Sequence, residues 1–236
     1  MQDFYPALVK TFSTARLNAY HDSDGTPLNL DVVARYAHNM VVSQRLNPAL
    51  HIFEVGLRNN VHQAFRTHFA DPEWYDKPGL LGVKQQAQLA VGRGKLSAAN
   101  KADAPDRLVA ELTLGFWVGL FSSNYEHHLW RANVSPLQAV FPRAPRHARN
   151  RAHISRVLNP LRDLRNRVAH WERVAHNPNL NNLKRDIDRV VGWLCPAARR
   201  LLEQCDTFDD AVGERAAATV RARVGACFEF EEIRSL

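Results

Sequence analysis

Apolar residues recur every three or four positions along most of the chain, which places them on one face of an α-helix. Runs that alternate apolar and polar residues, the pattern of β-strands, are scarce. We therefore predict an all-α, multi-helix bundle. The expected helices cover about 29–47, 47–69, 83–100, 105–130, 150–175 and 181–204, with a shorter one after Asp209.

Asparagines and prolines set several of these boundaries. Asn29 is expected to cap the first helix and Asn47 the second, because an asparagine side chain accepts hydrogen bonds from free N–H groups at a helix start. Pro48 would then stand in the first turn, where its missing N–H does no harm. Pro160 either kinks the helix over 150–175 or restarts it with Asn159 as the cap, and the sequence leaves both open.

The length of 236 residues and a hydrophobic content of 45% are enough for a buried core. We predict one domain over 1–236, with a long proline-rich loop at about 136–145 and a C-terminal extension at about 206–236.

The apolar run over 112–121 is about half the length needed to span a bilayer, so we expect a buried helix and no membrane partner. Gly115 and Gly119 would let another helix approach it closely, in the bundle or at a dimer seam.

Charge favours an anionic partner, with nucleic acid as the first candidate, since the net charge is +7 and the pI is near 9.7. Solubility alone could explain part of this excess, but seven basic residues crowd into 143–156, and contacts there with RNA would release counterions. The residues predicted to contact RNA are Arg146, Arg149, Arg151, Arg162 and Arg167.

Residues 165–170 place a permanent cation, an amide and an imidazole near the end of an amphipathic stretch. Asn166 and His170 are four residues apart on the face away from the apolar stripe, and Arg165 lies at the edge of that stripe. Metal-free RNA cleavage needs a group that moves the 2′-hydroxyl proton and a cation that stabilises the phosphorane. The alternative is an exposed histidine beside a solvated arginine. One helix does not easily bring all three side chains to one point.

Three segments resemble one family in the same order along the chain. The segment 164–170 resembles the HEPN signature, in which a histidine follows an arginine and a polar residue. The segments 53–60 and 111–118 resemble the Glu-and-Arg-Asn helix and the Gly-Phe-Trp segment of the Abi-like (AbiD/AbiF) abortive-infection proteins. The similarity runs from about 4 to about 205. Trp171-Glu172-Arg173 departs from the usual His-Glu-Pro continuation, since the glutamate is kept and the proline is missing.

This resemblance implies a metal-independent endoribonuclease whose homodimer joins two motif helices at a two-fold interface. Transesterification would leave a 2′,3′-cyclic phosphate and a 5′-hydroxyl. His170 would then transfer the proton, Arg165 would stabilise the phosphate and Asn166 would align it. The supporting residues would be Glu54, Arg58, Asn59 and Glu172. The implied role is a toxin in phage defence or a toxin–antitoxin pair, controlled by a small-RNA or protein antitoxin. The alternative is a non-catalytic RNA-binding or scaffold dimer.

Glu54 falls on the apolar face of its helix and therefore needs a partner. An ion pair with Arg58, four residues on, is the structural alternative to a role in orienting the motif.

No cofactor or metal is expected, since His127, His128 and His176 lack a ligand set. Residues 92–95 lack the Ser/Thr of a phosphate-binding loop, although their basic helix could line an RNA path.

Three cysteines, Cys195, Cys205 and Cys227, leave at least one thiol unpaired. Together with an N-terminus that does not resemble a secretory signal, they favour a reduced, cytoplasmic setting.

Overall fold

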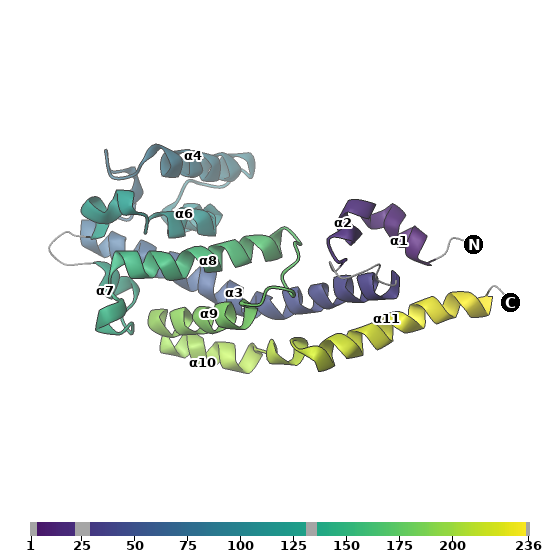
Figure 1. The fold of residues 1–236 in the computed structure, drawn as a ribbon. Coiled ribbons are helices and arrows are strands. Elements are labelled where there is room, and N and C mark those ends of the chain that lie inside the picture. Colours follow the sequence, from purple (N-terminus) through teal and green to yellow (C-terminus); the bar gives the residue numbers. More distant parts are fainter. Residues whose placement is uncertain (1–3, 22–28, 131–135, 235–236) are drawn as a thin grey trace. The chain divides into compact units, whose positions relative to one another are not determined.

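The computed structural model describes residues 4–21, 29–130 and 136–234, and within them every regular element is a helix (Figure 1). The prediction of an all-α fold is confirmed. The chain forms two compact units, each described here by itself. The first unit comprises Met1–Pro48, Leu164–Asn182 and Cys205–Leu236, and the second comprises Ala49–Asp163 and Leu183–Gln204. A single domain over 1–236 stays a prediction.

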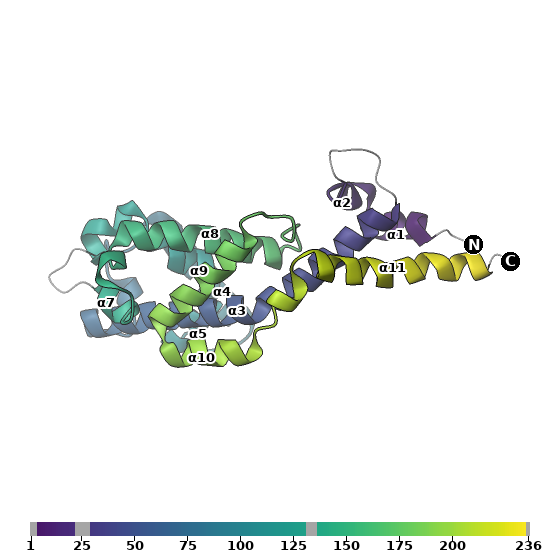
Figure 2. The same cartoon turned by 60° about the horizontal axis from the view of Figure 1, so that its bottom comes forward.

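The first unit contains α1 (Phe4–Phe12), α2 (Thr14–Asn18), the beginning of α3 (Asn29–Phe69), the end of α8 (Arg151–Ala169), η5 (Asp209–Ala211) and α11 (Glu214–Arg234). Its core is small: Leu17, Tyr20 and Val32 are buried, and the rings of Tyr20 and Tyr36 meet edge to face at 5.2 Å. Figures 1 and 2 show α11 beside the beginning of α3, where Arg221 pairs with Asp31 at 2.7 Å.

The second unit holds most of the helices. They are the rest of α3, η1 (Trp74–Asp76), α4 (Val83–Ala98), α5 (Pro105–Glu111), α6 (Leu114–Gly119), η2 (Ser123–Tyr125), a π-helix η3 (Glu126–Trp130), α7 (Pro136–Val140), η4 (Arg146–Ala148), most of α8 and of α9 (Leu180–Leu194), and α10 (Pro196–Cys205). Aromatic rings link them through the core: Phe65 meets Trp74 at 4.8 Å and Trp130 at 5.1 Å, and Phe121 stacks on Trp130 at 4.6 Å.

The two prolines do not end their helices, so the boundary expected at Asn47 and Pro48 is wrong, and of the two alternatives left open at Pro160 the restart is excluded. Helix α3 runs without a break through Pro48, and α8 runs through Pro160. Each proline removes one N–H from the helix, but the bonds on either side hold the backbone. Asn159 does not begin a new helix, because its Nδ2 donates back to the carbonyl of Ser155 at 2.7 Å.

Other boundaries differ in the opposite sense. The helix expected over 105–130 is broken into α5, α6, η2 and η3, and the helix expected over 181–204 is divided at Cys195–Pro196 into α9 and α10. Part of the predicted loop at 136–145 is the helix α7, and the short helix expected after Asp209 is the 21-residue α11. Helix α4 lies where the pattern predicts it.

Of the two glycines at which a close approach was expected, only Gly119 has a close neighbour within the second unit, the end of the Gln85 side chain. A Cβ on Gly119 would lie 2.6 Å from Nε2 of Gln85 on α4, whereas one on Gly115 would meet nothing closer than 3.6 Å. Residues Leu114, Phe116, Trp117 and Val118 are buried. None of the helices within the described ranges combines the length and the apolar character that a membrane span requires.

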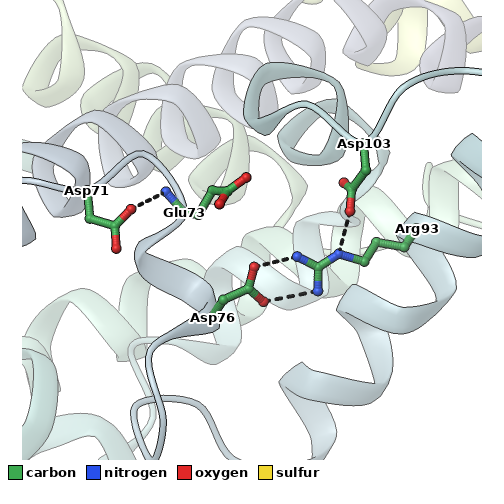
Figure 3. A network of polar contacts seen from close by, with 5 residues as sticks. All are labelled: Asp71, Glu73, Asp76, Arg93 and Asp103. Carbon is green, nitrogen blue, oxygen red and sulfur yellow. Dashed lines mark hydrogen bonds and ion pairs between the residues drawn. The ribbon is translucent and has the colours of Figure 1, made fainter.

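Arg93, within the segment 92–95, is a structural residue (Figure 3). Its Nη1 donates to Asp76 at 3.0 Å and its Nε donates to Asp103 at 2.8 Å, and these bonds raise the pKa of Arg93. The guanidinium also lies over the ring of Tyr75 at 5.9 Å. Arg93 thus ties α4 to the loops on both sides, and its charge is already neutralised by two carboxylates.

Candidate functional site

The three predicted catalytic residues lie at the end of α8, in the first unit. Helix α8 ends at Ala169, so Arg165 and Asn166 belong to its last turns and His170 follows directly after it. The N–H of His170 donates to the carbonyl of Asn166 at 2.9 Å, which continues the helical geometry by one residue. Arg165 and Asn166 are half-buried, while Arg167 and His170 are exposed.

Two backbone hydrogen bonds close the C-terminal end of the helix. Trp171 N–H donates to the carbonyl of Val168 at 3.1 Å, and Glu172 N–H donates to the carbonyl of Arg167 at 2.8 Å. These are the two bonds of a Schellman motif, whose left-handed residue is usually glycine. Here that residue is Trp171, with φ of +59°. A side chain in this conformation costs about 1–2 kcal/mol, so other contacts must hold the turn in place.

Those contacts come from two residues that the sequence analysis did not single out as functional. Asn39 on α3, only 4% exposed, accepts from the N–H groups of Val174 at 2.6 Å and Ala175 at 3.0 Å. Its Nδ2 also donates to the carbonyl of Glu172 at 3.2 Å. Arg16 on α2 donates to the carbonyl of Trp171. The segment that follows the motif is therefore fixed by its backbone, and the side chains of Trp171 and Glu172 remain exposed.

The amide and the imidazole of the motif are not joined to one another. Within the described ranges, no hydrogen bond links the Asn166 side chain to the His170 side chain, and the Glu172 side chain is exposed. One copy of the helix therefore presents these two groups separately, near its end.

The field at this turn is positive. Burial lowers the pKa of His176, and the neighbouring guanidinium groups of Arg173 and Arg167 lower it further. The charge of Arg173 is held close to the turn, since its Nη1 donates to the carbonyl of Ala19 at 2.7 Å and its guanidinium lies over the ring of Tyr20. An anion near the turn would be stabilised by the same charges.

The predicted supporting residues on α3 belong to the second unit. Nη1 of Arg58 donates to the carbonyl of Ala110 at 3.3 Å, and its Nε is buried without a hydrogen-bond partner. The bond to Ala110, and not the expected ion pair with Glu54, is the contact that the structure gives the Arg58 guanidinium. Asn59 is exposed. The neighbouring Asn60, which was not predicted as functional, donates to the carbonyls of Val140 at 2.9 Å and Leu194 at 3.2 Å.

The predicted RNA-contacting arginines of the second unit divide into two groups. Arg146 is exposed, and Arg162 pairs with its neighbour Asp163 at 2.8 Å. Arg149, in contrast, donates from Nε to the carbonyl of Ala144 at 2.6 Å.

Arg151 makes more contacts within the unit than Arg149 does. It is held by Glu126 and by the carbonyl of Phe121, and its side chain is only 13% exposed. The guanidinium of Arg151 is thus used within the unit, and its contact with RNA stays a prediction. The surface around Arg146 is nevertheless positive: burial lowers the pKa of His153, and Arg156, Arg189 and His147 lower it further.

The remaining candidate chemistry is sparse. In the described parts of the chain, no three His, Cys, Asp or Glu side chains are grouped closely enough to hold a metal ion. The three cysteines are exposed and unpaired.

Searches against protein-family models, curated proteins and solved structures found no match to this chain.

Proposed function

We propose that the protein is a metal-independent endoribonuclease of the HEPN type, with Arg165, Asn166 and His170 as its catalytic residues. The observation that supports this most directly is the end of α8, where the three side chains lie within about two turns, directly before a segment whose backbone is bound by Asn39 and Arg16. The resemblance to Abi-like proteins supplies the reaction and the order of the motif.

In the proposed reaction, a ribose 2′-oxygen attacks the adjacent phosphorus while the His170 imidazole takes its proton. Arg165 stabilises the negative charge on the phosphorane, and Asn166 hydrogen-bonds a phosphate oxygen. The bond from phosphorus to the 5′-oxygen then breaks, and the departing oxygen takes up a proton. The products are a 2′,3′-cyclic phosphate and a 5′-hydroxyl.

A homodimer is part of the same proposal. One helix does not easily bring Arg165, Asn166 and His170 to one point, so a second copy of the motif would complete the cleft. The exposed Arg146 and Arg167 would guide RNA toward it. Such an enzyme would act as a toxin in phage defence or in a toxin–antitoxin pair, in the cytoplasm and under the control of an RNA or protein antitoxin.

The test compares wild-type protein with His170→Ala and Arg165→Ala on single-stranded RNA in EDTA, followed by analysis of the fragment ends. Cyclic phosphates are expected with wild type and a loss of at least about 100-fold with either variant. His51→Ala changes another exposed histidine and is the matched control. Cleavage at the wild-type rate by both site variants would overturn the assignment.

The dimer is tested separately by light scattering at micromolar concentration. A mass near that of one 26.8 kDa chain would remove the shared cleft. A stable dimer that binds RNA without cutting it would instead favour the scaffold function.

A further inference from the structure

A cavity of about 550 Å³ opens in the first unit beside the turn that follows α8. Its walls include Val168 and Trp171 from the motif segment, Arg16 from α2, and Tyr36 and Ser43 from α3. The volume lies within the range of about 300–1,000 Å³ that is typical of small-molecule sites. The proposed reaction uses none of these five side chains.

The walls of the cavity have a distinctive composition. They combine two aromatic rings, Tyr36 and Trp171, with apolar side chains and the amides of Gln44 and Asn47, and no acidic side chain is among the lining residues within the described ranges. The amide of Asn39, also on the wall, is already bonded to the turn. Aromatic faces and neutral hydrogen-bonding groups together suit a flat, uncharged heterocycle. They suit a free phosphate less well, because the one arginine on the wall, Arg16, already donates to the carbonyl of Trp171.

One polar group on α3 lacks its usual partner at this wall. The Oγ of Ser43 is buried and has no hydrogen-bond partner within the described residues. An unsatisfied buried group costs free energy, and a ligand that offers a donor or an acceptor can remove that cost.

Trp171 has the features of a stacking platform. It is 71% exposed, and it occupies a left-handed position that glycine would fill without strain. Across the parts of the chain that the structure describes, no aromatic ring packs against it. A large aromatic side chain held by its backbone at the mouth of a cavity, directly after a candidate catalytic histidine, can stack on a nucleobase with little loss of its own freedom.

We infer that this cavity binds one unpaired nucleobase of the RNA strand, stacked on Trp171 with its edge toward Ser43 and Gln44. The inference rests on the proposed function for its ligand and adds a base-recognition subsite to it. The subsite would set where along the strand the enzyme cuts, and the reaction itself would still depend on His170.

The decisive variant is Trp171→Gly, because it removes the ring and also relieves the strain of the left-handed position. Its melting temperature should rise by roughly 2–4 °C, so a loss of binding could not be attributed to unfolding. Trp171→Phe keeps an aromatic face and should keep most of the binding. Ser43→Ala changes the far wall without touching the turn.

Binding is measured by fluorescence anisotropy with a labelled 2′-O-methyl RNA hexamer, which cannot be cleaved through a 2′-hydroxyl, and with an abasic strand of equal charge. Wild type should prefer the base-bearing strand, and Trp171→Gly should weaken binding to that strand by about 5- to 150-fold while leaving the abasic strand unchanged. Ser43→Ala should change the order of preference among hexamers of single base composition.

The outcomes separate this inference from the proposed function. If wild type cleaves RNA but Trp171→Gly binds both strands as wild type does, the subsite is overturned and the nuclease stands. If wild type does not cleave but the preference depends on Trp171, the subsite stands and the nuclease does not. If Trp171→Gly converts a dimer into a monomer, the cavity is occupied by a second copy of the chain and the inference is overturned.

Discussion

The corner around Arg93 in the second unit and the turn after α8 in the first unit use polar groups in opposite ways. At the corner, a charged side chain is itself the connector, since two carboxylates satisfy the guanidinium of Arg93 (Figure 3). At the turn, Asn39 and Arg16 bind backbone groups, and the side chains of the turn remain exposed. A charged residue in a satisfied network stabilises a fold, whereas exposed polar side chains on a fixed backbone can meet a ligand.

The largest effect should follow from removing Asn39. Asn39→Ala would leave two buried or half-buried N–H groups and one carbonyl without their partner, at a cost of about 2–4 kcal/mol in the free energy of unfolding. Urea denaturation measures this cost. Because the turn would also lose its fixed backbone, cleavage of RNA should fall even where the protein is still folded.

Asn39→Asp is the matched control, since a carboxylate keeps the acceptor for Val174 and Ala175 and loses only the donor to Glu172. Asn39→Asp should therefore be more stable and more active than Asn39→Ala, and less stable and less active than wild type. Equal losses in both variants would show that Asn39 does not act through these hydrogen bonds.

A smaller effect is expected at the corner. Arg93→Ala should lower the free energy of unfolding by roughly 1–2 kcal/mol, because the pair is partly exposed and only part of its bonding energy contributes to stability. Arg93→Lys should recover little of it, since an ammonium group does not form the paired contact with Asp76. Denaturation measures the loss.

RNA cleavage by both Arg93 variants should stay within about twofold of wild type under conditions where they are folded. A specific loss of RNA binding in Arg93→Lys, with stability unchanged, would place this residue on an RNA path and would remove the contrast between the two regions.

Periodicity was sufficient to predict the fold class and the position of α4, because the apolar spacing directly reflects which face of a helix is buried. It failed at Pro48, where the local rule predicts a boundary and packing along the rest of the helix outweighs one missing hydrogen bond, and it could not decide between a kink and a restart at Pro160. It also failed over 105–130, where short helices and a π-helix replace one long helix.

The candidate site was predictable only in part. The residue types of 165–170 carry their own chemistry, so the sequence indicates them. The contributions of Asn39 and Arg16 depend on contacts 133 and 155 residues away, and no local pattern distinguishes such residues from ordinary polar positions on a helix. For the same reason, the sequence did not indicate that Glu126, 25 residues earlier, holds Arg151, one of the residues predicted to contact RNA.

The smallest expected effect concerns His62 in the second unit, a buried histidine for which the neutral form is favoured. Trp74 Nε1 donates to its Nδ1 at 3.2 Å, and burial, with a smaller contribution from Arg66, lowers its pKa even though Asp106 acts in the opposite direction. The folded protein therefore binds this proton less readily than the unfolded chain, for which the pKa is about 6.5. The stability that depends on neutral His62 is present above pH 6.5 and is lost as pH falls through the folded value.

The expected slope is at most about 1.4 kcal/mol per pH unit for this one proton, measured by urea denaturation between pH 7 and pH 5. His62→Gln keeps an acceptor for Trp74 and does not titrate, so it should remove this part of the slope and leave the parts due to His153 and His176. Equal slopes in the variant and the wild type would mean that His62 can be protonated at no cost. The second unit would then tolerate an added buried charge without a carboxylate partner, unlike the corner around Arg93.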